Sequence, residues 1–105
     1  MSDLEKNIYI SNLFNFYKKL LTQKQQDIFY DYYYNDIGLS EISLEKGISR
    51  QAVLDSIKKT ENLLLEYENK LKLYEIYINQ TNLITEIQKS KNYSDIVNIL
   101  KLWED

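Results

Sequence analysis

The segment SEISLEKGISRQAV, from Ser40 to Val53, has the clearest structural pattern in the chain. Ser40 can cap a short helix, and Gly47 supplies a residue that tolerates positive φ in a turn. Ser49 can cap a second helix that begins at Arg50. A short helix, a glycine turn and a second helix are typical of a helix-turn-helix, whose second helix can enter a groove of nucleic acid.

The apolar residues of this segment match the packing that the motif requires. Five of them are expected to anchor it, namely Ile42 and Leu44 in the first helix, Ile48 in the turn, and Val53 and Ile57 in the second helix. Ser43 departs from the usual pattern, because a small apolar residue, most often alanine, lets the two helices approach at this position. Serine is also small, so the segment is still expected to form the motif.

Helical patterns extend over nearly all of the 105 residues, which include no proline and only two glycines to interrupt them. Helices are expected from near Leu4 to Leu21, from the Thr22 cap to Tyr34 or Asn35, and from Arg50 to Ile78, and two more begin at Thr81 or Asn82 and after Tyr93-Ser94. Thr22 and Gln25 match a capping box. Gly38 is expected to end the second helix in a left-handed conformation.

The fourth helix carries an unusually long apolar stripe. Its members follow alternating steps of four and three, with Thr60 as the polar exception: Val53, Ile57, Thr60, Leu64, Tyr67, Leu71, Tyr74 and Ile78. A continuous helix from Arg50 to Ile78 would measure about 43 Å. The last helix carries Ile96, Val97, Leu100 and Trp103. The sequence predicts an all-α single domain over residues 1–105, with a helix-turn-helix bundle over 4–69 and a helical C-terminal extension over 70–105 packed on the long helix.

The composition argues against an enzyme. The chain has no histidine and no cysteine, so the commonest general base, the thiolate nucleophile and the usual transition-metal ligands are absent. It also has no glycine-rich phosphate loop. We therefore expect no catalytic residues, no metal site and no cofactor.

Hydropathy and charge bear on the cellular location of the protein and on its binding to nucleic acid. No stretch approaches the roughly 20 apolar residues of a membrane span, and the N-terminus lacks a basic region followed by an apolar run. We therefore expect a cytoplasmic protein without membrane insertion. The formal net charge of -3 does not favour non-specific binding to a phosphate backbone.

Two motifs of the chain are similar to those of one known family. The first is Gly47-Ile48-Ser49-Arg50-Gln51-Ala52-Val53 with the following Ile57-Lys58-Lys59-Thr60-Glu61 and Leu64-x-x-Tyr67-Glu68-x-Lys70-Leu71, and the second is Asn12-Leu13-Phe14-x-Phe16-Tyr17-x-x-Leu20-Leu21-Thr22-x-Lys24-Gln25. Together they resemble the YlxM family of small bacterial proteins. The resemblance implies a helix-turn-helix like that of sigma-factor region 4 and a role in the signal recognition particle pathway. It also implies RNA or protein components of that particle as partners, and no catalytic residues.

The outer face of the second motif helix is the expected contact surface. Five residues are the candidates for contact with nucleic acid or another partner: Arg50, Gln51, Leu54, Lys58 and Lys59. Arginine and glutamine can read base edges, and lysine can meet phosphates. Asp55 opposes phosphate at the centre of this face, and four basic residues between Ser40 and Thr60 stand against three acidic ones. The alternative is that these side chains only solvate an exposed helix.

Tyr30 and Tyr34 form a candidate protein interface. They lie four residues apart on one face of their helix, whereas Tyr32 falls on the opposite, inner face and is expected in the core. The pair can pack under the C-terminal helices, lie in a protein interface or stack on RNA bases. The stripe of the fourth helix can also pair two copies into a homodimer, although intramolecular packing is expected first.

Three functions fit these observations. The first is a helix-turn-helix accessory protein that binds components of the signal recognition particle. The second is a sequence-specific DNA-binding transcriptional regulator, acting as a dimer whose recognition helices lie about 34 Å apart. The third is a protein-only adaptor that uses the helix-turn-helix as a scaffold.

Overall fold

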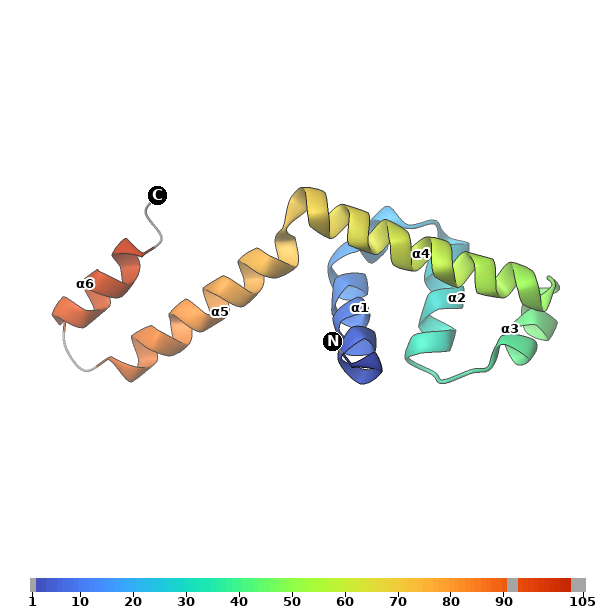
Figure 1. The fold of residues 1–105 in the computed structure, drawn as a ribbon, viewed down its shortest axis with the longest axis horizontal. Coiled ribbons are helices and arrows are strands. Elements are labelled where there is room, and N and C mark those ends of the chain that lie inside the picture. Colours follow the sequence, from blue (N-terminus) through green and yellow to red (C-terminus); the bar gives the residue numbers. More distant parts are fainter. Residues whose placement is uncertain (1, 91–92, 103–105) are drawn as a thin grey trace. The chain divides into compact units, whose positions relative to one another are not determined.

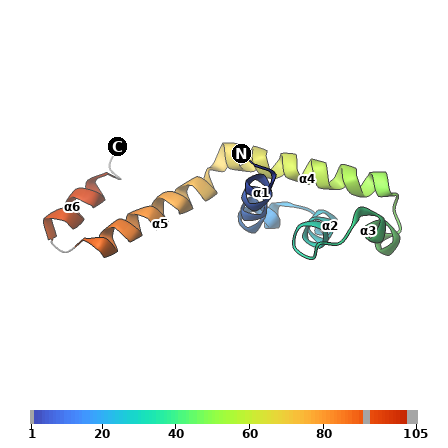
Figure 2. The same ribbon diagram turned by 60° about the horizontal axis from the view of Figure 1, so that its bottom comes forward.

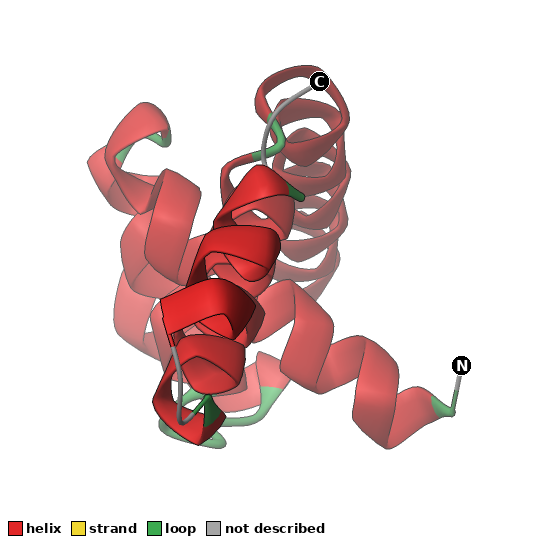
Figure 3. Cartoon of the chain, turned by 90° about the vertical axis from the view of Figure 1, so that its left-hand side faces the viewer, coloured by secondary structure: helices red, strands yellow, loops and turns green. Residues whose placement is uncertain are grey.

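The computed structural model describes residues 2–90 and 93–102, and the regular elements in these ranges are all helical (Figure 1). They are α1 Asp3–Tyr17, the 3-10 helix η1 Lys18–Leu20, α2 Gln23–Tyr33, α3 Leu39–Lys46, α4 Arg50–Leu71, α5 Leu73–Lys89 and α6 Tyr93–Lys101. Figure 3 shows helix and loop, and no strand, over the same ranges. The prediction of an all-α protein is confirmed. None of these described helices is long and apolar enough to span a membrane.

The chain divides into two compact units between Leu71 and Lys72. In the first unit α1, α2 and α3 each pack against α4 (Figure 2). The buried hydrophobic residues come from all four helices and the loop before α2: Ile10, Leu13, Phe14, Tyr17, Leu21, Ile28, Phe29, Ile42, Val53, Ile57 and Leu64. Burial of this apolar surface drives the assembly of the unit, and α4 is the element that the other three helices share.

The inner face of α4 is the one that the apolar spacing predicts. Val53, Ile57 and Leu64 are buried, and Thr60 lies among them with no exposed surface. The Thr60 hydroxyl oxygen has no hydrogen-bond partner within the part of the chain that the structure describes. The core of the first unit therefore contains one unpaired polar group.

The inner face of α4 ends in a polar contact. Glu68 is buried, and its Oε1 accepts a 2.5 Å hydrogen bond from the hydroxyl of Tyr17 in α1. Leu71, which the stripe predicts on the inner face, is 48% exposed. The last turn of α4 is thus held to α1 by a tyrosine–glutamate pair.

The long helix is shorter than predicted. Lys72 adopts a left-handed conformation with φ of 59°, and α5 then runs unbroken over Leu73–Lys89. The expected continuous helix from Arg50 to Ile78 is therefore wrong, and so is the expected helix start at Thr81 or Asn82. The backbone turns at a lysine, a residue type that does not break helices, and the apolar spacing continues across it. Neither the residue type nor the apolar spacing could therefore have predicted that the helix ends before Lys72.

The capping of α2 is confirmed, but the turn that follows it differs from the prediction. The Thr22 hydroxyl accepts a hydrogen bond from the Gln25 amide, and Gln25 Oε1 accepts one from the Thr22 amide, at 3.2 and 3.0 Å. Gly38 has φ of -71° and caps α3, so it is not the left-handed residue, and Ser40 is not the cap. Asp36 takes the left-handed conformation with φ of 54°, because aspartate also tolerates this region.

The aromatic core of α2 uses Tyr33 rather than Tyr32. Phe29 stacks on Phe14 at a ring-centroid distance of 4.6 Å, and Tyr33 stacks on Phe29 at 4.3 Å. Tyr32, predicted in the core, is 38% exposed. It lies in the last turn of α2, where it faces a groove beside α1 instead of the packed interior.

The second unit consists of α5 and α6, which pack against each other. None of its described residues is fully buried, and six apolar or aromatic ones are half-buried: Tyr74, Leu83, Ile87, Ile96, Val97 and Ile99. Trp103, expected in the last helix, lies outside the described residues. The packing of these helices on α4 stays a prediction.

We expect Thr60→Val to stabilise the protein, because valine keeps the shape and removes the unpaired buried hydroxyl. An unsatisfied buried polar group costs about 1–3 kcal/mol, so the free energy of unfolding should rise by about 1 kcal/mol. Urea unfolding followed by circular dichroism measures the change. Thr60→Ser keeps the hydroxyl and loses a methyl group, so it should destabilise the protein. A valine variant no more stable than the wild type would contradict the prediction.

Candidate nucleic-acid interface

The turn between α3 and α4 is closed by hydrogen bonds of Ser43. The amides of Gly47 and Ile48 donate to the Ser43 carbonyl at 3.0 and 3.2 Å, and the Ser43 hydroxyl donates to the Ile48 carbonyl at 2.6 Å. Gly47 takes the predicted left-handed conformation, with φ of 68°. Ser49 then caps α4 as predicted, because its hydroxyl accepts a 3.0 Å hydrogen bond from the Ala52 amide. Ser43 therefore stabilises the turn through its hydrogen bonds, and its small size also lets α3 and α4 approach each other.

Four of the five predicted anchors hold the motif together. One cluster contains Ile28, Ile42, Val53 and Ile57, with Ile48 packed against it. Leu44 is 85% exposed, so its predicted role as an anchor is wrong. The reason is the helical period: two positions after the buried Ile42, a side chain points to the opposite side of α3. The anchored turn fixes where α4 begins and which face it exposes.

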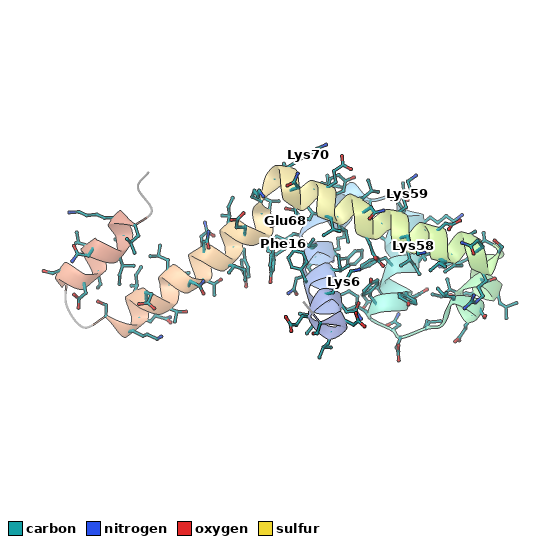
Figure 4. All side chains as sticks on the ribbon, in the orientation of Figure 1. Lys6, Phe16, Lys58, Lys59, Glu68 and Lys70 are labelled. Atoms are coloured by element: carbon teal, nitrogen blue, oxygen red, sulfur yellow. The ribbon has the colours of Figure 1, made fainter. Side chains whose placement is uncertain are left out.

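The first half of α4 presents a polar face to solvent. Of the five candidate contact residues, Leu54 is half-buried. The other four are exposed: Arg50, Gln51, Lys58 and Lys59. Figure 4 shows Lys58 and Lys59 on this helix. At the centre of the face, Gln51 Nε2 donates a 2.8 Å hydrogen bond to Asp55 Oδ1. A ligand that reads Gln51 must compete with this contact.

Two of the five candidates lie at a groove. Leu54 and Lys58 line a space of about 350 Å³ together with residues of α1 and α2, among them Lys6, Asn7 and Tyr32. Lys6 is thus a second cation beside the candidate surface (Figure 4). No local pattern distinguishes Lys6 from the other polar residues of α1, so its place beside this surface could not be predicted from the sequence. Arg50, Gln51 and Lys59 do not line this groove.

Glu61 opposes the positive charge of the same groove. The hydroxyl of Tyr33 donates a 2.7 Å hydrogen bond to Glu61 Oε1. Burial and the contact with Glu61 both raise the pKa of Tyr33, so its hydroxyl keeps the proton that it donates. Within residues 2–90 and 93–102, no group of three acidic side chains is placed to hold a metal ion.

Tyr30 and Tyr34 form a stacked pair on the surface of α2. Their ring centroids lie 5.0 Å apart, and both side chains are more than 40% exposed. The Tyr34 hydroxyl lies 3.0 Å from both the Ser11 carbonyl oxygen and Asn15 Oδ1 of α1. Burial raises the pKa of Tyr34. Tyr34 therefore helps to join α2 to α1, and the role of the pair as a protein interface stays a prediction.

The comparison with known proteins agrees with this architecture. A family model described as helix-turn-helix proteins of the YlxM / p13 type, UPF0122, matches residues 4–102. The chain belongs to this family. A UPF0122 protein of Shouchella clausii is 44% identical over 83% of this chain and 80% of its own length. One of Lactococcus lactis subsp. cremoris (strain MG1363) is 45% identical over 97% of this chain and 91% of its own. The family resemblance predicted from the two sequence motifs is confirmed.

We expect Gly47→Ala to destabilise the protein by about 1 kcal/mol, because a left-handed residue with a Cβ atom costs about 1–2 kcal/mol. A Cβ atom added to Gly47 meets no atom within 4 Å, so the cost is one of backbone conformation alone. Gly47→Asn is the matched comparison, since asparagine also adds a Cβ atom but adopts the left-handed region more readily than alanine. Urea unfolding should show the larger loss for alanine, and equal losses for the two variants would contradict the prediction.

We expect Ser43→Ala to lower the free energy of unfolding by about 1–2 kcal/mol, because the half-buried Ile48 carbonyl loses its hydroxyl donor. Ser40→Ala, at an exposed position of α3, serves as the control and should change stability by less. Thermal and urea unfolding measure both variants. An alanine at position 43 that leaves stability unchanged would show that the hydroxyl does not fasten the turn.

Proposed function

We propose that this chain is an accessory protein that binds nucleic acid through the first half of α4, and that its ligand is the RNA of the signal recognition particle. The observation that supports binding is the polar face of α4, which is held clear of the core by the anchored turn. Membership of a helix-turn-helix family supports the same use of this helix. The choice of the particle rests on the resemblance to the YlxM family.

The face carries too few cations to bind a phosphate backbone strongly, so we expect the ligand to offer base edges as well as phosphates. Arg50, Lys58 and Lys59 are its cations, and each phosphate contact contributes about 0.7–0.9 to the slope of log affinity against log salt. Binding should therefore have a slope of about -2 to -3. Arg50 and Gln51 supply donors for base edges, and unpaired loops of RNA expose such edges.

The double variant Arg50→Glu with Lys58→Glu tests the proposed face. Two lost phosphate contacts should weaken binding about tenfold or more and reduce the salt slope by about 2. Fluorescence anisotropy of labelled signal recognition particle RNA, titrated with the full chain at several salt concentrations, measures both quantities.

The matched control is Lys24→Glu with Lys70→Glu, which changes the net charge equally at two exposed positions outside the proposed face. This control should keep most of the affinity, and circular dichroism should show that both variants are folded. Equal losses in the two variants would show that only the net charge matters. Tighter binding to a duplex DNA of the same length would contradict RNA as the ligand.

A further inference from the structure

Tyr32 lies where two grooves of the first unit meet. One is the space of about 350 Å³ beside Leu54 and Lys58, which we call the Lys58 groove. The other measures about 540 Å³ and is lined by residues of α1, the end of α2 and the loop that follows. Three residues line both grooves: Asn7, Tyr32 and Tyr33. Spaces of about 300–1,000 Å³ are typical of ligand sites, so this junction is large enough to receive a ligand.

The ring of Tyr32 offers an aromatic face at this junction. Its side chain is 38% exposed, and its ring meets that of Tyr33 edge-on, at 73° and a centroid distance of 5.4 Å. An edge-on contact leaves at least one face of the Tyr32 ring uncovered by Tyr33. Leu54 of α4 is half-buried and lines the same groove. Sites that take an unpaired base hold it against aromatic and apolar side chains of this kind.

The polar groups of the Lys58 groove suit a neutral ring better than a phosphate. Its lining residues have no net formal charge, because two lysines stand against two carboxylates: Lys6, Lys58, Asp3 and Glu61. The Asn7 amide adds a donor and an acceptor. Glu61 Oε1 accepts the hydrogen bond of Tyr33, and its Oε2 can accept one from a ligand. The groove therefore offers hydrogen-bond donors and acceptors to a ligand that carries both.

We propose that the Lys58 groove holds one unpaired RNA base that carries an exocyclic amino group, stacked on Tyr32. This inference rests on the proposed binding of RNA by α4, since Leu54 and Lys58 belong to both surfaces. Carboxylates accept hydrogen bonds from base amino groups, and asparagine can pair with adenine through a donor and an acceptor. Lys58 is exposed, so it can meet the phosphate of the same nucleotide. Unpaired loops of RNA present bases in this way.

The larger groove limits the path of the RNA backbone. Among the described residues that line it, Asp36 is charged and none is basic. A phosphate in this groove would meet a negative charge without a cation, so the backbone is expected to follow the side of Lys6 and Lys58 (Figure 4). The base then points from the lysines toward Tyr32.

Replacement of Tyr32 tests the stacking contact. Tyr32→Ala should weaken the binding of labelled signal recognition particle RNA about fivefold or more, because stacking of one base on an aromatic ring contributes at least that factor. The salt slope should stay unchanged, because no phosphate contact is lost. Tyr32→Phe keeps the ring and should keep most of the affinity, whereas Tyr32→Leu keeps only an apolar side chain and should behave as alanine does. Fluorescence anisotropy of the full chain at several salt concentrations measures all three variants.

Tyr30→Ala is the matched control, because Tyr30 is a comparably exposed tyrosine of the same helix that lines neither groove. It should keep the wild-type affinity, and circular dichroism should show that the tyrosine variants are folded. Equal losses at positions 30 and 32 overturn the inference. So does an unchanged affinity in Tyr32→Ala while Arg50→Glu with Lys58→Glu still weakens binding, and in that case the proposed function stands. A wild-type chain that does not bind the RNA overturns both.

Two single-stranded probes test which base the groove accepts. The wild-type chain at low salt should bind an oligonucleotide of adenosines about fivefold or more tightly than one of uridines of equal length, because uracil has no exocyclic amino group. Tyr32→Ala should reduce the affinity for the adenosine probe. Equal affinities for the two probes, tighter binding of the uridine probe, or binding of neither by a chain that binds the particle RNA overturns the inference.

Discussion

The burial of one face of α4 is the constraint on which the first unit depends. Val53, Ile57 and Leu64 form the surface against which α1, α2 and α3 are packed. Because a helix has only one rotation that buries these three residues together, the opposite face is also set. That face carries Gln51 and Lys58 into solvent at the start of the helix. Core packing and the candidate binding surface are thus two sides of one element.

Polar contacts hold both ends of this element. At the start, the Ser43 hydroxyl and the left-handed Gly47 fix the turn that leads into the helix. At the end, the buried Glu68 accepts a hydrogen bond from Tyr17. Four residues later, Lys72 adopts a left-handed conformation and the helix has ended. Directional hydrogen bonds position a helix more sharply than apolar contacts do, because they tolerate little change in distance or angle. The exposed face of α4 is therefore held in a defined place.

The chemistry of the exposed face explains why charge alone identifies no ligand. Asp55 lies among the cations and is already bound by Gln51, and the groove that Lys6 and Lys58 line also contains the acidic Asp3 and Glu61. Opposite charges that lie so close largely cancel at a distance, so recognition must depend on contacts made at short range. The family supplies the motif, and the shape of the surface must supply the specificity.

Features that depend on residues three or four apart were predictable from the sequence. They include the all-α class, the buried face of α4, the capping box of Thr22 and Gln25, and the left-handed Gly47. Each follows from the helical period or from the conformational freedom of one residue type, and both can be read directly from the amino-acid sequence. The same information was enough to recognise the family.

Features that depend on distant residues appeared only in the fold. The exposure of Tyr32 and the groove that Lys6 and Lys58 line together are set by where α1 and α2 lie, which no local spacing encodes. The end of α4 was also not predictable from the sequence, because the backbone changes direction at Lys72 while the apolar spacing continues across it. A period identifies the face of a helix, whereas its length and its neighbours result from contacts between segments far apart in the chain.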